Sequence, residues 1–193
     1  MKSSQFRMKL MKKSVWMLMF WGVFVSIQAG IVDPFHHVKE GAVPERIQFR
    51  LGEVNVINEG EFTRIESEYH GTTSEYGLPE LPAFSTMYQI DPEKLYQVDF
   101  TVVESHVIEN VKIYPHQPPK SEIGLHYDTA FYSSTAPYPA ENLIISESQI
   151  MRGLHLINIQ VIPFLYHPTN NRLEIYDEIE ILVEEIGESG MTD

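Results

Sequence analysis

The clearest hydrophobic pattern in the chain lies near its C-terminal end, between Arg172 and Glu184. Apolar and acidic side chains alternate there, which is the period-two pattern of a strand with one buried face and one exposed face. Tyr176 and Asp177 interrupt the alternation, so we expect a bulge or bend at that point. The apolar side is formed by Leu173, Ile175, Ile179, Ile181 and Val183, and the polar side by Glu174, Glu178, Glu180 and Glu184.

A second apolar run precedes this strand, from Leu154 to Phe164. The connecting residues 166–171 are rich in Pro and Asn, which favour turn conformations. The pattern therefore predicts that residues 154–164 and 172–184 form an antiparallel hairpin.

Several shorter runs with the same alternation occur earlier in the chain, and none has the length and period of an amphipathic helix outside residues 8–27. Seven to nine short strands separated by turn signals predict an all-β fold, an antiparallel β-sandwich. The earlier expected strands are 45–57 with a break at Gly52, 62–69, 84–90, 95–103, 107–114 and a short one at 146–150. We expect a core that includes Ile47, Phe49, Phe100, Val102, Ile113, Leu156, Val161, Ile175, Ile179 and Ile181.

The first 29 residues have the composition of a secretory signal peptide. Basic residues precede a short apolar run, Val15 to Val25, and Ala29 offers a small residue for cleavage. An uncleaved membrane anchor is the alternative, although a spanning helix needs about 20 apolar residues. We expect a signal-peptide helix in 1–29, a leader arm in 30–44, the β-sandwich in 45–185 and an acidic tail or linker in 186–193, in a protein of the periplasm, the cell surface or the extracellular space.

Charge and composition exclude several functions. The 193 residues contain 14 basic and 27 acidic side chains, a net charge of −13, which disfavours binding to nucleic acids. There is no cysteine, and hence no disulfide and no cysteine nucleophile. The eight histidines show no metal-binding spacing, and no Gly-x-Ser-x-Gly motif or phosphate-binding loop occurs. We expect no metal, no cofactor and no catalytic activity.

Three stretches in order resemble one known family. They are Gly77-Leu-Pro-Glu-Leu-Pro82, then Glu109-Asn-Val-Lys-Ile-Tyr-Pro-His-Gln-Pro-Pro119, and then Arg152-Gly with Val161-Ile-Pro-Phe-Leu-Tyr-His-Pro168 and Arg172-Leu-Glu-Ile-Tyr176. With the signal peptide, they resemble the N-terminal propeptide domain of gingipain-like cysteine peptidases of family C25. The resemblance covers about Arg46 to Val183.

The resemblance implies a secreted domain that packs on a cysteine peptidase catalytic domain, keeps it latent and assists its folding, in cis in a full-length form or in trans. No catalytic domain lies within this chain, so we expect a truncated gene product, a fragment or a free-standing inhibitor-like protein. The alternative function is a non-catalytic adhesive or structural β-sandwich of a secreted or cell-surface protein.

The residues between Pro115 and Ala140 are the candidate functional segment, because a long connection in a compact domain is usually functional or disordered. Gln117, Pro118 and Pro119 favour an extended entry, which suits a protease cleft. The resemblance implies an acidic specificity pocket that accepts Arg or Lys, so Lys120 is the first candidate to enter it and Arg152 the second. The alternative is that Lys120 is a solvated loop residue and that Arg152 pairs with a nearby carboxylate.

Overall fold

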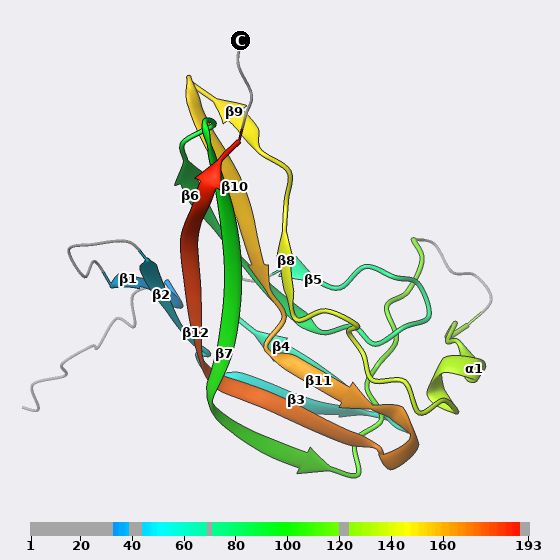
Figure 1. Ribbon diagram of the computed structural model, residues 1–193. Coiled ribbons are helices and arrows are strands. Elements are labelled where there is room, and N and C mark those ends of the chain that lie inside the picture. The colour runs from blue at the N-terminus through cyan, green and yellow to red at the C-terminus, as the bar shows by residue number, and fades with distance from the viewer. Residues whose placement is uncertain (1–32, 39–43, 69–70, 120–123, 190–193) are drawn as a thin grey trace, which may run out of the picture. The chain divides into compact units, whose positions relative to one another are not determined.

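The computed structural model describes residues 33–38, 44–68, 71–119 and 124–189, which form antiparallel sheets with almost no helix (Figure 1). The all-β prediction is confirmed, whereas the signal peptide and most of the leader arm lie outside the described residues. The strands are β1 (Phe35–Val38), β2 (Glu45–Arg50), β3 (Val54–Glu59), β4 (Phe62–Ser67), β5 (Gly71–Thr72), β6 (Pro82–Ile90), β7 (Lys94–Glu109), β8 (Leu143–Ile145), β9 (Gln149–Met151), β10 (Leu154–Val161), β11 (Phe164–His167) and β12 (Arg172–Glu188). The helices are α1 (Thr129–Tyr132) and the 3-10 turn η1 (Pro168–Asn170).

The first sheet is organised around β12, whose apolar positions are those predicted from the sequence. One edge of β12 pairs with β2 and β11, the other edge pairs with β7 along nearly its whole length, and β1 pairs with β2. The pairing with β7 shifts register between Tyr176 and Glu178, so the predicted bulge is confirmed. The five apolar side chains of the alternation are all buried: Leu173, Ile175, Ile179, Ile181 and Val183.

The second sheet has the strand order β5-β6-β10-β8, and β9 pairs with β10. The predicted hairpin is therefore only partly right, because β10 pairs with β6 and only the short β11 pairs with β12. Between them, Ile162 and Pro163 carry the chain from one sheet to the other. Pro163 has no amide hydrogen for a sheet ladder, and its carbonyl accepts from the Tyr176 amide at 2.9 Å.

The two larger sheets meet face to face through side chains of β2 and β6. The Phe49 and Phe84 rings lie 5.3 Å apart at an edge-to-face angle, and the Tyr88 hydroxyl donates to Glu45 at 2.9 Å. β3 and β4 form a third, two-stranded sheet, whose Ile65 packs into the common core. It is tied to the rest by a bridge between Thr63 and Ile113.

The core differs from the prediction at three positions. Ile47, Phe49, Ile113, Val161, Ile175, Ile179 and Ile181 are buried as expected. Leu156 is only half-buried, because side chains on a strand alternate between faces and it lies on the opposite face to Ile157, Ile159 and Val161. Phe100 is half-buried and Val102 is exposed, because both lie on β7, at the open edge of its sheet.

Three element boundaries also differ from the sequence-based expectation. The two strands expected at 95–103 and 107–114 are one strand, β7, which ends where Asn110 adopts a left-handed conformation with φ of 61°. Phe35–Val38, expected within an irregular arm, form β1. β12 continues to Glu188, past the boundary expected at 185. The described part of the chain contains no helix with the length and apolar character of a membrane span.

Candidate functional site

The segment that follows β7 starts from a rigid base. The Thr63 amide donates to the Lys112 carbonyl at 2.7 Å, and the Tyr114 amide donates to the Thr63 carbonyl at 2.8 Å. On the other side, the Glu80 amide donates to the Tyr114 carbonyl at 2.8 Å. Ile113, between these bonds, is fully buried. The segment therefore behaves as an extra strand, and its anchoring fixes where the long loop begins.

Gln117 closes the loop that follows. Its Nε2 donates to the carbonyls of Pro115 and His126, each at 2.8 Å, and its Oε1 accepts from the His126 amide at 2.9 Å. A single side chain thus supplies the hydrogen bonds that a neighbouring strand would otherwise supply. We call the described residues 117–119 and 124–126 the clamped loop. Pro118 and Pro119 follow Gln117, and Lys120 lies outside the described residues.

A second loop, at residues 76–80, holds the clamped loop from the side. The His116 amide donates to the Leu78 carbonyl at 2.8 Å, and the Gly77 amide donates to the His116 carbonyl at 2.9 Å. Gly77 has a φ of 82°, and a Cβ there would lie 3.2 Å from the Asp128 nitrogen and from the His126 ring. Only glycine combines this conformation with so close an approach, which explains its place in the first sequence stretch.

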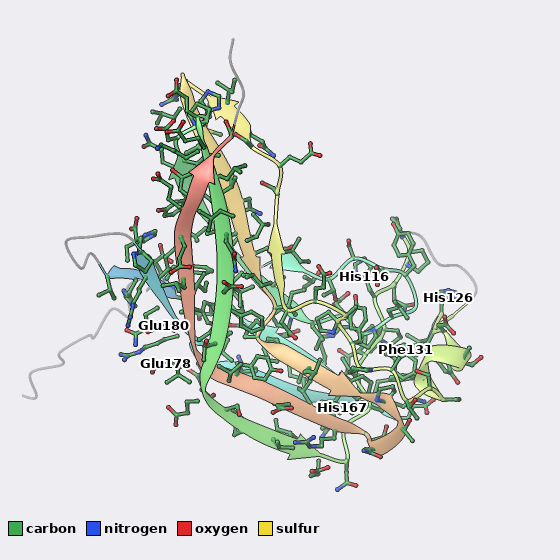
Figure 2. The ribbon with its side chains drawn as sticks, in the orientation of Figure 1. His116, His126, Phe131, His167, Glu178 and Glu180 are labelled. Atoms are coloured by element: carbon green, nitrogen blue, oxygen red, sulfur yellow. The ribbon has the colours of Figure 1, made fainter. Side chains whose placement is uncertain are left out.

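Charged side chains link the two loops to β4 (Figure 2 labels His116 and His126). The two carboxylate oxygens of Glu80 contact His116 Nδ1 and Arg64 Nη1, each at 2.7 Å. The Tyr76 ring stacks on His116 at 5.5 Å. Arg64 also binds Glu59, and that hydrogen bond raises the pKa of Arg64 and lowers the pKa of Glu59. This chain of charged side chains fixes the position of the loop base relative to β4.

An aromatic cluster supports the far end of the clamped loop. The Tyr132 hydroxyl donates to the Ile113 carbonyl at 2.7 Å, and burial raises the pKa of Tyr132. Asp128 caps α1 by accepting from the Ala130 and Phe131 amides at 2.9 and 3.0 Å. The cluster comprises Phe62, Tyr127, Phe131, Tyr132, Tyr138 and Tyr166.

Lys112 is enclosed by the same cluster. Its ammonium lies 4.3 Å from the ring centre of Phe62 and 4.9 Å from that of Tyr127, within the range of cation–π attraction. It also binds Glu61 at 2.6 Å. The ammonium of Lys112 is therefore held in place by contacts within the domain.

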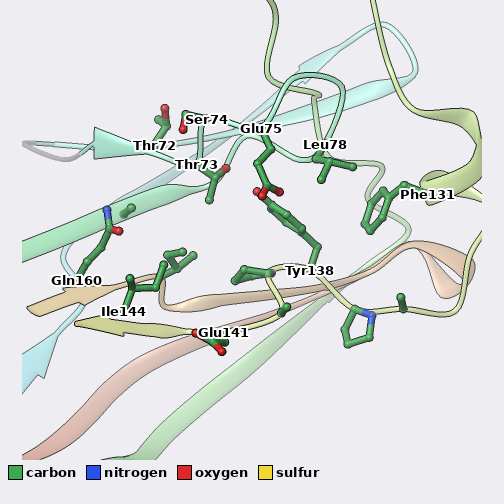
Figure 3. A pocket seen from close by; sticks show the side chains of 16 residues that line it. Thr72, Thr73, Ser74, Glu75, Leu78, Phe131, Tyr138, Glu141, Ile144 and Gln160 are labelled. Atoms are coloured by element: carbon green, nitrogen blue, oxygen red, sulfur yellow. The ribbon is translucent and has the colours of Figure 1, made fainter. Parts of the chain in front are cut away.

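Next to the loop base lies a groove of about 580 Å³, framed by residues 72–78 on one side and 136–141 on the other (Figure 3). Glu75 and Tyr138 extend toward each other across it, and burial raises the pKa of Tyr138 to about 12. The lining combines two carboxylates, Glu75 and Glu141, with apolar side chains. In the described part of the chain, no group of three His, Asp or Glu side chains could hold a metal ion.

Arg152 lies in a different environment from the clamped loop. Arg152 and Gly153 have φ values of 52° and 82°, the signs required at the two central positions of a type I′ turn, and they join β9 to β10. They form the exposed tip of the hairpin. The eight residues of β10 extend over roughly 25 Å from this turn, and Figure 1 shows the turn at the opposite end of β10 from β11 and α1.

Comparison with known proteins gives one consistent result. The family Propeptide_C25 matches residues 39–190. Gingipain R1 of Porphyromonas gingivalis is 31% identical over 126 residues, which are 61% of this chain and only 12% of that protein.

Two solved structures share the fold. The complex of the pro- and mature domains of RgpB from Porphyromonas gingivalis matches with a TM-score of 0.69 and 21% identity, over 83% of this chain and 90% of that chain. A structure concerned with the zymogenic latency of gingipain K from the same organism matches with a TM-score of 0.67 and 20% identity, over 82% of this chain and 96% of that chain.

Proposed function

The chain belongs to the Propeptide_C25 family, and on this premise we propose that it keeps a C25-type cysteine peptidase latent and assists the folding of that peptidase. The observation that carries the proposal is the extent of the family match, which includes nearly all of the described domain. The domain is a propeptide rather than a catalytic unit. Its natural partner is then a peptidase catalytic domain, either in the same polypeptide or as a separate molecule.

We further propose that the clamped loop is the part of the domain that meets the peptidase cleft. A cleft binds an extended segment, and the Pro118-Pro119 pair restricts this segment to extended conformations before binding. The clamp made by Gln117 fixes both ends of the loop, which lowers the entropy lost when the loop is immobilised. Preorganisation of this kind suits an inhibitor better than a freely moving loop would.

Lys120 remains the first candidate for the cation that enters an acidic specificity pocket, and Arg152 the second. Lys120 is favoured because it directly follows Pro119 and the side chain of Gln117 holds the main chain of His126 on the other side. The tight turn at Arg152 argues against Arg152, because a protease cleft needs an extended chain on both sides of the bound residue. A tight two-residue turn at the tip of a hairpin does not offer one.

The proposal is tested by titrating the mature domain of RgpB with the wild-type chain and with the Lys120→Ala and Arg152→Ala variants. We expect inhibition by the wild type, and a loss of about thirtyfold or more in the inhibition constant for Lys120→Ala, as for a buried hot-spot cation. Arg152→Ala should inhibit like the wild type. Equal inhibition by all three proteins would remove both cations from the mechanism, and absence of inhibition by the wild type would refute the proposed function.

A further inference from the structure

β7 forms an open edge of the first sheet over an unusual length. Within the described residues, β12 is the strand that pairs with β7, and no strand pairs with its other side. The strand has 16 residues, and seven consecutive ones, Thr101 to Val107, are exposed. Proteins normally protect such edges with prolines, inward-pointing charges or short strands, because an open edge recruits further strands.

The sequence of β7 has the alternation of a strand with one buried face. Val98, Phe100 and Val102 pair with Val183, Ile181 and Ile179 of β12, and side chains opposite each other in an antiparallel pair lie on the same face. These residues of β7 therefore belong to the inner face of the sandwich. Val102 is nevertheless 36% exposed, although its partner Ile179 is fully buried. The residues expected in the core from the sequence are thus only partly covered in the isolated domain.

The strand order shows which side of the sandwich is open. β2 lies over β6, through the Phe49–Phe84 contact and the Tyr88–Glu45 hydrogen bond. β7 also contacts β6, because the rings of Tyr96 and Tyr88 lie 6.4 Å apart, and β8 pairs with β10 on the side opposite β6. Ile145 of β8 pairs with the buried Ile159, so it too points inward, and it is 38% exposed. β7 and β8 therefore each leave an apolar inner-face residue, Val102 and Ile145, partly in contact with water.

Charge determines what kind of strand fits this edge. β7 carries Asp99, Glu104 and Glu109, and its cation, Lys94, already binds Glu185 at 3.1 Å. Glu104 lies opposite Glu178 across the pairing, an unfavourable like-charge pair, and has no ion pair within the described residues. A second copy of this acidic chain, with 27 acidic and 14 basic side chains, would add to the repulsion. A partner strand with Lys or Arg between apolar positions would relieve it.

We propose that β7 is a docking edge at which a strand of the C25 peptidase domain adds to the first sheet. This inference rests on the proposed function and names a second contact surface, separate from the clamped loop. The added strand forms main-chain hydrogen bonds with β7, covers the inner-face side chains around Val102 and places basic side chains against Glu104 and Asp99. Edge addition is an established mode of recognition, in which main-chain bonds supply affinity and alternate side chains supply specificity.

The test uses the full chain and a catalytically inactive mature domain of RgpB as the probe. Amide hydrogen exchange is measured along residues 96–107 in the free chain and in the complex, together with the dissociation constants of two variants. Val103→Lys places a charge on the open edge of β7, where Val103 is 59% exposed. The matched control is Met87→Lys on β6, because Met87 is 52% exposed and lies beyond Pro82 and Ala83, the residues of β6 that pair with β5.

We expect alternate amides of β7 to exchange about tenfold more slowly in the complex. Val103→Lys should weaken binding about tenfold or more, and Met87→Lys by less than about twofold. If a complex forms but exchange in β7 is unchanged, or if the RgpB domain binds both variants equally, the docking edge is overturned while the proposed function stays intact. Protection of β7 by self-association of the free chain would overturn it in favour of a second copy. If no complex forms, the proposed function itself fails.

Discussion

The side-chain amide of Gln117 pairs with the main chain of His126 in both directions, donating to its carbonyl at 2.8 Å and accepting from its amide at 2.9 Å. This pair converts a proline-rich connection into a loop with fixed ends.

Replacing Gln117 by Ala should release the loop. Three hydrogen bonds are lost, at a cost to folding stability of about 1–2 kcal/mol, because the site is only partly buried and water can replace some of them. The larger effect should be on cleavage of the loop by an unrelated protease, which we expect to be at least tenfold faster because the released ends open more often. The control is Gln149→Ala, since Gln149 is an exposed glutamine of β9. Equal cleavage rates for both variants would contradict the role of Gln117.

Truncating Ile181 to Ala should destabilise the domain by about 2–5 kcal/mol, the usual cost of a large-to-small change in a packed core. Ile181 is fully buried and central in β12. Ile186→Ala on the same strand is the matched control, because Ile186 is 57% exposed; its cost should stay below about 0.5 kcal/mol. Chemical denaturation of both variants measures the difference, and similar losses would mean that the strand faces are assigned incorrectly.

The stability of the domain should fall at alkaline pH through its buried tyrosines. Burial raises the pKa of Tyr166 from 10.0 to about 12, so the folded state favours the neutral phenol. The corresponding stabilisation is complete below pH 10 and is lost as the pH rises through about 12. We expect the free energy of unfolding to fall less steeply from pH 10 to pH 12 in Tyr166→Phe than in the wild type. Tyr76→Phe, at an exposed tyrosine, should follow the wild type.

The export of the chain is a prediction from residues 1–29 alone. If they are a signal peptide, expression in a bacterial host should yield a secreted or periplasmic protein whose N-terminus begins at Gly30. N-terminal sequencing of that protein measures the cleavage site. Recovery of the uncleaved chain in the membrane fraction would favour the anchor instead.

The sequence predicted the elements whose pattern is local and failed where tertiary context decides. β12 and its bulge were predictable, because alternation and its interruption are visible in consecutive residues. β10 and β11 could not be separated from sequence, because an apolar run looks the same whether it stays in one sheet or crosses to another at Pro163. Phe100 and Val102 have the pattern of core residues, but an open edge is set by strand order, which no local pattern contains.

The candidate site was predictable to a similar extent. The long connection and its prolines were visible, and Gln117 was among the candidates, but its function as a clamp depends on a main-chain partner nine residues away. The open edge of β7 was not predicted at all. The one signal for it is that apolar side chains alternate along β7 but are not fully buried in the isolated domain. This mismatch between pattern and burial can be recognised only when the sequence is compared with the structure.

The central claim is that this domain holds a C25 peptidase latent. The most direct test measures the activity of mature RgpB on two substrates, in the presence of an equimolar or greater amount of the full chain. One substrate is a short chromogenic peptide and the other a folded protein. We predict that hydrolysis of both is blocked, because a loop in the cleft excludes small substrates as well as large ones, and that digestion of the domain by an unrelated protease restores both activities. Undiminished hydrolysis of both substrates at micromolar concentrations of the chain would contradict the account.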